Sequence, residues 1–135
     1  MITAVDSNIL IDIIDGTEEF ATISVAALKR ARVGGVAIIC DIVYAEICVA
    51  FDRRDQCDDF LAELNIKVEA LDAASSFLAS RSWMSYLKSG GKKNRILPDF
   101  LIAGHAANQA DLLLTRDGGF FRSHFPKLNV IAPQA

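Results

Sequence analysis

Short apolar runs alternate along this chain with longer segments whose apolar residues recur at helical spacing. The apolar runs predict strands at residues 2–5, 36–39, 67–71, 112–115 and 129–131. The periodic segments predict helices at residues 8–15, 18–32, 53–64, 73–88 and 98–107, and a further helix that carries Glu46 and begins at Asp41. The pair Gly118-Gly119 predicts a turn between the last two strands.

Several of these helices begin at residues that favour a helix start. Thr17, Asp41 and Asp72 are predicted N-caps, because their side-chain oxygens can accept hydrogen bonds from free backbone N–H groups. Ser7 lies near the cap of the first helix, and Pro98 falls in the first turn of the last one. These residues divide the chain into regular strand–helix units.

Strands that are apolar along their length, and that alternate with helices, indicate a parallel sheet covered by helices on both faces. The sequence contains no internal repeat, linker or low-complexity segment, so we predict a single α/β domain over residues 1–135. Ligands of such sheets bind beyond the carboxyl ends of the strands. Residues that follow the strands are therefore the first candidates for a functional site.

Composition narrows the class of protein further. No apolar run approaches the roughly 20 residues that span a bilayer, and the N-terminus lacks the pattern of a signal peptide, so we expect a cytoplasmic protein without a membrane partner. Cys40, Cys48 and Cys57 show no CxxC spacing and are predicted to be reduced thiols. The net charge of −3 argues against general electrostatic affinity for nucleic acid.

Four acidic residues stand where a solvent-facing carboxylate is not expected: Asp6, Glu46, Asp99 and Asp117. The first and last follow predicted strands, the second interrupts an apolar stretch, and the third opens a helix. Carboxylates gathered at one edge of a sheet repel one another unless a cation or protons offset their charge. Such a set offers the oxygen ligands that a hard divalent metal ion needs. If the four converge, the chain is a metal-dependent enzyme.

Each acid also has an ordinary structural explanation when it is taken alone. Asp6 can cap the first helix, and Asp117 can be a turn residue. Glu46 can face solvent, and Asp99 can act only through the helix dipole. The order of the four along the chain, at strand end, helix, helix start and strand end, favours a dedicated metal site over four unrelated roles.

Basic and aromatic residues give weaker signals. The segment 88–95 is either a solvated loop or a phosphate clamp beside the site. We expect His105 to be a packed, hydrogen-bonded histidine and His124 to be a surface residue. Trp83 and Tyr86, three residues apart on one helical face, are expected to belong to the core or to a partner groove.

Four motifs of the chain resemble those of the PIN-domain nucleases, and among these the VapC-type toxins of bacterial toxin–antitoxin pairs. The motifs are Val5-Asp6-Ser7-Asn8-Ile9-Leu10, Ala45-Glu46-Ile47, Leu97-Pro98-Asp99-Phe100-Leu101-Ile102-Ala103-Gly104-His105-Ala106 and Leu114-Thr115-Arg116-Asp117-Gly118-Gly119-Phe120-Phe121. They occur in order, and the resemblance extends over essentially the whole chain. It implies a three-layer α/β/α sandwich with a parallel five-stranded sheet.

The resemblance also implies roles for individual residues. The catalytic, metal-binding acids would be Asp6, Glu46, Asp99 and Asp117, with one or two Mg²⁺ or Mn²⁺ ions. Asn8 and Thr115 would support the site through hydrogen bonds. The implied substrate is single-stranded or looped RNA, such as a tRNA or rRNA loop, and the candidate RNA contacts are Lys92, Lys93, Arg95 and Arg116. A VapB-type antitoxin and a second copy of the chain would be the protein partners.

The chemistry expected of such a site is hydrolysis of a phosphodiester bond by metal-activated water. The sequence shows no Ser-His-Asp or Cys-His set and no phosphate-binding glycine loop. A phosphatase or phosphotransfer domain would be a different reading of the first aspartate, although Asn8 stands where the haloacid-dehalogenase type would need a second acid. The sequence is also compatible with a binding module without catalysis and with a housekeeping RNA-processing nuclease.

Overall fold

Parallel pairing joins all the strands in a computed structural model of the chain, which describes residues 1–91 and 97–133. The strands are β1 (Ile2–Val5), β2 (Val36–Ile39), β3 (Ile66–Val68), β4 (Leu112–Leu114) and β5 (Val130–Ile131). The helices are α1 (Ser7–Asp15), α2 (Glu18–Val33), α3 (Asp41–Cys48), α4 (Arg54–Glu63), α5 (Ala73–Lys88), α6 (Leu97–Gln109) and α7 (Gly118–His124). Within the described residues, no helix is both long and apolar enough to cross a membrane.

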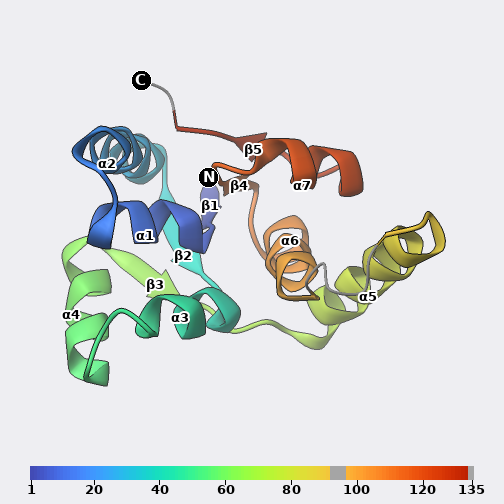
Figure 1. Cartoon of the computed structure of the whole chain (residues 1–135), viewed down its shortest axis with the longest axis horizontal. Coiled ribbons are helices and arrows are strands. Elements are labelled where there is room, and N and C mark those ends of the chain that lie inside the picture. Colours follow the sequence, from blue (N-terminus) through green and yellow to red (C-terminus); the bar gives the residue numbers. More distant parts are fainter. Residues whose placement is uncertain (92–96, 134–135) are drawn as a thin grey trace.

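The sheet has the strand order β3-β2-β1-β4-β5, which places β1 at its centre. Helices α1, α2 and α4 lie on one side of this sheet and α5, α6 and α7 on the other, whereas α3 contacts both α1 and α6 (Figure 1). The predicted three-layer α/β/α sandwich with a parallel five-stranded sheet is therefore confirmed. The chain crosses back over the sheet between β3 and β4, so the direction of winding reverses beside β1.

Burial explains why the apolar runs form strands. The central strands β1 and β4 are buried along nearly their whole length, as expected where helices cover both faces of a sheet. Their side chains pack with Ile9, Leu10 and Phe100 from α1 and α6 in one continuous core. Two predicted N-caps are confirmed, because the side chain of Thr17 accepts a hydrogen bond from Phe20 N and that of Asp72 accepts one from Ser75 N.

Other predictions of local structure were wrong. Asp41 is not the cap of α3; Cys40 occupies that position, and Oδ1 of Asp41 instead accepts a hydrogen bond from the backbone N–H of Leu71, 3.0 Å away. Strand β3 is shorter than predicted and begins one residue earlier. Gly118 and Gly119 do not form a simple turn but begin α7. This helix forms despite its glycines because Phe121 is buried in the core.

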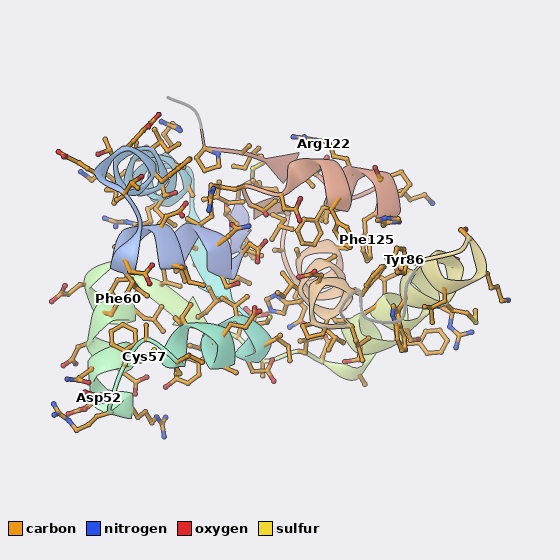
Figure 2. All side chains as sticks on the ribbon, viewed as in Figure 1. Asp52, Cys57, Phe60, Tyr86, Arg122 and Phe125 are labelled. Carbon is orange, nitrogen blue, oxygen red and sulfur yellow. The ribbon has the colours of Figure 1, made fainter. Side chains whose placement is uncertain are left out.

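An aromatic cluster fixes α7 against α5 and α6. The ring of His124 lies 5.0 Å from that of Tyr86 and 4.8 Å from that of Phe120, so this half-buried histidine also packs in the cluster, which the prediction of a surface residue did not include. Phe100 of α6 contacts Phe120 and Phe125, with ring centroids 5.6 and 5.5 Å apart. Tyr86 and Phe125 lie between α5 and α7 in Figure 2. Trp83 and Tyr86 both pack against the core, which confirms one of their two expected roles.

Helices α5 and α6 approach each other closely at Gly104 of α6. A Cβ atom at this position would lie 2.6 Å from the carbonyl oxygen of Ser75 and 3.0 Å from Cβ of Ala79, both on α5. The first contact is with backbone and cannot be relieved by a rotamer change. The absence of a side chain at Gly104 therefore sets the spacing between α5 and α6, and with it the position of the N-terminal turn of α6.

We expect Gly104→Ala to destabilise the protein. Overpacking typically costs about 1–3 kcal/mol, whereas the higher helix propensity of alanine recovers at most about 1 kcal/mol. Urea unfolding followed by circular dichroism measures the difference in the free energy of unfolding. Gly119→Ala is the matched control, because its added Cβ meets no atom within 4 Å apart from its chain neighbours and the backbone of its own helix. Equal stabilities of the two variants would contradict the close approach of α5 and α6.

Candidate active site

Asp6 lies at the carboxyl end of the central strand and at the N-terminus of α1. It is buried, with 5% of its surface exposed. Its backbone N–H donates to the carbonyl oxygen of Leu114 (2.9 Å), which continues the pairing of β1 with β4. Its side chain caps α1, because Oδ1 accepts a hydrogen bond from the backbone N–H of Ser7 (2.8 Å). Asp6 is thus both a helix cap and a buried carboxylate.

Thr115 and Asn8 hold the second oxygen of this carboxylate. Oδ2 of Asp6 accepts a hydrogen bond from Oγ1 of Thr115 (2.7 Å) and another from Nδ2 of Asn8 (3.2 Å). Thr115 Oγ1 also accepts from the backbone N–H of Asp117 (3.0 Å), and Oδ1 of Asn8 accepts from the backbone N–H of Arg116 (3.2 Å). This network ties the ends of β1 and β4 together and fixes the orientation of the Asp6 carboxylate.

Glu46 and Asp99 bring two more carboxylates close to Asp6. Glu46 is exposed on α3, the helix that contacts both α1 and α6, and Asp99 is the third residue of α6. The Ser7 hydroxyl lies 3.5 Å from Oδ1 of Asp6 and also interacts with the carboxylate of Glu46. The structure therefore brings together three of the four predicted acids around the N-terminus of α1.

Electrostatics confirm that these carboxylates influence one another. Burial raises the pKa of Asp6 from its ordinary value of 3.8 to about 6, and the charges of Asp99 and Glu46 contribute to the rise, against the lowering effect of its hydrogen bonds to Thr115 and Ser7. The pKa of Glu46 is raised by partial burial and by the charge of Asp99, and lowered by Ser7. Like charges close together and partly removed from water are the condition in which a bound cation is most favourable.

The fourth acid, Asp117, is exposed at the N-terminus of α7, three residues after the end of β4. Its backbone is tied to the network through Thr115. Within residues 1–91 and 97–133, no group of three or more His, Cys, Asp or Glu side chains converges tightly enough to hold a metal ion as placed. The donor set nevertheless fits a hard cation chemically, since it consists of carboxylate oxygens and of hydroxyl and amide groups that orient them.

Arg116 has partners inside the fold. Its Nε lies 2.7 Å from Oδ2 of Asp12, a buried residue of α1, and its guanidinium lies over the ring of Phe20 at 4.8 Å. Oδ2 of Asp12 also accepts a hydrogen bond from Ser24 of α2 (3.1 Å). Arg116 thereby connects the segment after β4 to α1 and α2. Lys92, Lys93 and Arg95 lie outside the described residues.

His105 is not available as a general base. It is buried in α6, and its Nε2 lies 2.9 Å from the carbonyl oxygen of Glu69, to which it donates a hydrogen bond when neutral. Burial lowers its pKa, which favours this neutral form. The prediction of a packed, hydrogen-bonded histidine is confirmed.

Two residues of the site were not singled out from the sequence. Ser7 was treated only as a residue near a cap, yet it contacts two of the acids. Asp12 stands among Ile11, Ile13 and Ile14, an apolar context of the same kind that drew attention to Glu46. The signal for Asp12 was therefore present in the sequence.

Comparisons with known proteins bear on this site. Among protein-family models, the PIN domain matches residues 3–125. The structure is similar to that of VapBC2 from Rickettsia felis bound to a DNA fragment from its promoter, at 21% identity and a TM-score of 0.75, over 99% of this chain and 100% of that chain. It is also similar to VapBC-1 from nontypeable Haemophilus influenzae (20% identity, TM-score 0.71, 98% of each chain). A toxin–antitoxin complex from Klebsiella pneumoniae matches at 23% identity, with a TM-score of 0.62 and 98% of each chain covered. No curated protein matches.

The raised pKa of Asp6 predicts how the stability of the metal-free protein depends on pH. Below pH 3.8 the carboxyl group is protonated in both the folded and the unfolded chain, and burying it carries no charge penalty. Between pH 3.8 and about 6 the unfolded chain loses this proton while the folded chain keeps it, so the free energy of unfolding falls across this window, by up to about 3 kcal/mol, and stays at the lower level above it.

We therefore expect Asp6→Asn to be more stable than the parent protein at pH 8 in EDTA, and to lose this advantage at pH 4. The gain in the free energy of unfolding should be only about 1–2 kcal/mol, which is less than the full penalty. The reason is that the Asn amide places a donor where one carboxylate oxygen accepted a hydrogen bond. Urea titrations at both pH values measure the difference. Asp59→Asn, an exposed position of α4, is the control and should show no such pH dependence. A pH-independent difference for Asp6→Asn would contradict the pKa shift.

Proposed function

The chain belongs to the PIN-domain family, and from this membership and its acid cluster we propose that it is a metal-dependent endoribonuclease. The observation that carries the proposal is the buried carboxylate of Asp6, whose pKa is raised by burial and by the charges of Asp99 and Glu46. A protein gains nothing in stability from such an arrangement unless a cation or a proton offsets it. Mg²⁺ and Mn²⁺ are among the hard cations that carboxylate oxygens suit.

In this proposal the metal ligands are Asp6, Glu46, Asp99 and Asp117. When bound, one or two divalent ions would supply an activated water and positive charge for the phosphoryl oxygens. The chain itself orients the ligands. Thr115 and the backbone N–H of Ser7 each hold one oxygen of Asp6, so the carboxylate cannot rotate away. Asn8 adds a second bond to Oδ2, and this is the supporting role that we propose for Asn8 and Thr115.

Substrate binding needs positive charge near these acids, because the whole chain carries a net charge of −3. The candidates by sequence are Lys92, Lys93 and Arg95, just before α6, together with Arg116. Arg116 already pairs with Asp12, and its side chain remains 39% exposed, so it could meet a phosphate only while keeping its place in the fold. The proposed substrate class is a single-stranded or looped RNA, such as a tRNA or rRNA loop.

We further propose that the protein is the toxin of a toxin–antitoxin pair and acts in the cytoplasm to inhibit growth. Support comes from the names of similar structures, which include VapBC assemblies and a toxin–antitoxin complex. A VapB-type antitoxin and a homodimer are the corresponding partners. A housekeeping RNA-processing nuclease would share the same site chemistry, so the biological role needs its own test.

We expect the purified protein to cut total bacterial RNA into discrete fragments in Mg²⁺ or Mn²⁺ and to stop in EDTA. Asp6→Asn, Glu46→Gln and Asp99→Asn should each abolish cleavage while the circular dichroism spectrum stays unchanged. Mg²⁺ should raise the melting temperature of the parent protein and not that of Asp6→Asn, since a ligand stabilises only the state that binds it. Mapping the fragment ends identifies the target.

Asp59→Asn serves as the control in this assay, because it removes an exposed carboxylate of α4, outside the proposed ligand set. Cleavage that survives EDTA, or that persists in Asp6→Asn, would contradict the proposal. Induced expression in bacteria separates the two biological roles: a toxin arrests growth, and Asp6→Asn does not. Growth at the normal rate despite active enzyme would favour an RNA-processing role.

A further inference from the structure

Two cysteine thiols lie side by side where α3 meets α4. Cys48 is the last residue of α3, and Cys57 lies near the start of α4. Their sulfur atoms are 3.5 Å apart. Figure 2 shows Cys57 on the side of α4 that faces α3. The third cysteine, Cys40, is buried at the end of β2, and all three are free thiols.

The two thiols differ in accessibility. Cys57 is fully buried, whereas Cys48 is only half-buried. Burial, together with the neighbouring Cys48, raises the pKa of Cys57 to about 12, so this residue stays a protonated thiol. A solvent-borne oxidant would therefore reach Cys48 first and find a second thiol already in contact with it.

We propose that Cys48 and Cys57 form an oxidisable pair, which a hydroperoxide converts into a reversible intramolecular disulfide. In the first step the sulfur of Cys48 takes the terminal oxygen of the peroxide, giving a sulfenic acid and, from hydrogen peroxide, one water. In the second step the sulfur of Cys57 attacks the sulfenic sulfur. The S–O bond breaks, the S–S bond forms, and the hydroxide leaves with the Cys57 proton as a second water.

The geometry requires only a small movement. A disulfide bond is about 2.0 Å long, so the sulfur atoms must approach by about 1.5 Å from their 3.5 Å separation. The connection between α3 and α4 is short, and Val49 at its start is 87% exposed, so packing of this residue does not oppose the approach. Ile47, in the last turn of α3, is fully buried, so the core around it must take up the movement of this turn. The start of α4 is held separately, by hydrogen bonds from the backbone N–H groups of Asp52 and Arg53 to Gln56.

The position of the pair gives the modification a consequence. Glu46 lies two residues before Cys48 on the same helix. A bond that pulls the end of α3 toward α4 also moves the helix that presents Glu46 to Asp6 and Asp99. This consequence rests on the proposed function, whereas formation of the disulfide does not.

The test begins with folded protein treated with hydrogen peroxide and then quenched with an alkylating agent. We expect two of the three thiols to be lost and to return on addition of dithiothreitol. A protease that cleaves before aspartate separates the cysteines, because Asp41 follows Cys40 and Asp52 and Asp55 lie between the other two. Mass spectrometry should therefore show fragment 41–51 linked to fragment 55–57, with the fragment containing Cys40 alkylated.

Serine variants of the cysteines test which two thiols form the bond. Cys48→Ser and Cys57→Ser should each abolish the linked fragments, and Cys40→Ser should leave them unchanged. Any of three results would overturn the proposed disulfide. These are retention of all three thiols, a link that includes Cys40, and oxidation that stops at an oxyacid of Cys48.

The RNA-cleavage assay tests separately whether the disulfide affects the active site. The oxidised protein should cut more slowly than the reduced one, and Cys57→Ser should lose this sensitivity. Equal rates would overturn the coupling to Glu46 and leave the thiol chemistry standing. If the reduced protein cuts no RNA, the proposed function fails while the fragment analysis still decides on the disulfide.

Discussion

The burial of one carboxylate, that of Asp6, is the constraint around which the rest of the site is arranged. Removing a carboxylate from water is unfavourable, and two further negative charges nearby make it more so. The fold offsets part of this penalty with the hydroxyl of Thr115, the amide of Asn8 and the backbone N–H of Ser7. These bonds do not restore an ordinary pKa, so a penalty remains that a cation or a proton must remove. The site is therefore held ready for a positive charge by the packing around it.

The sheet topology explains how acids so distant in sequence come together. Helices that follow parallel strands begin at the carboxyl edge of the sheet, and the N-termini of α1 and α7 share this edge. Asp6, Asp99 and Asp117 all stand at helix starts. The positive ends of the helix dipoles attract these negative charges and partly offset their mutual repulsion. Glu46 lies further along α3, which reaches the others because it contacts both α1 and α6.

Sequence patterns predicted the parts of this structure that depend on local chemistry. The short apolar runs of β1 and β2 and the caps at Thr17 and Asp72 were predictable because burial and hydrogen bonding act there within a few residues. Helix α7 and the packing of His124 were not, because both depend on aromatic rings from α5 and α6. Asp41 satisfied the cap pattern, but its side chain bonds to Leu71, thirty residues away along the chain.

The candidate site, too, was predictable from the sequence only in part. The positions of the acids relative to strands and helix starts were visible in the sequence, since a parallel sheet sends such positions to one edge. The ion pair of Arg116 with Asp12 was not visible in the sequence, because it requires α1, α2 and the end of β4 to meet.

This ion pair also affects the charge that the proposed substrate would meet at the site. It engages the cation next to Asp117, so within the described residues this edge is acidic, whereas the proposed RNA substrate is itself anionic. One or two bound divalent ions would change the net charge from −3 to about −1 or +1, with all of the change at this edge. The same ion that relieves the repulsion around Asp6 would thus also remove the repulsion of the substrate, so RNA association and catalysis would share one requirement for metal.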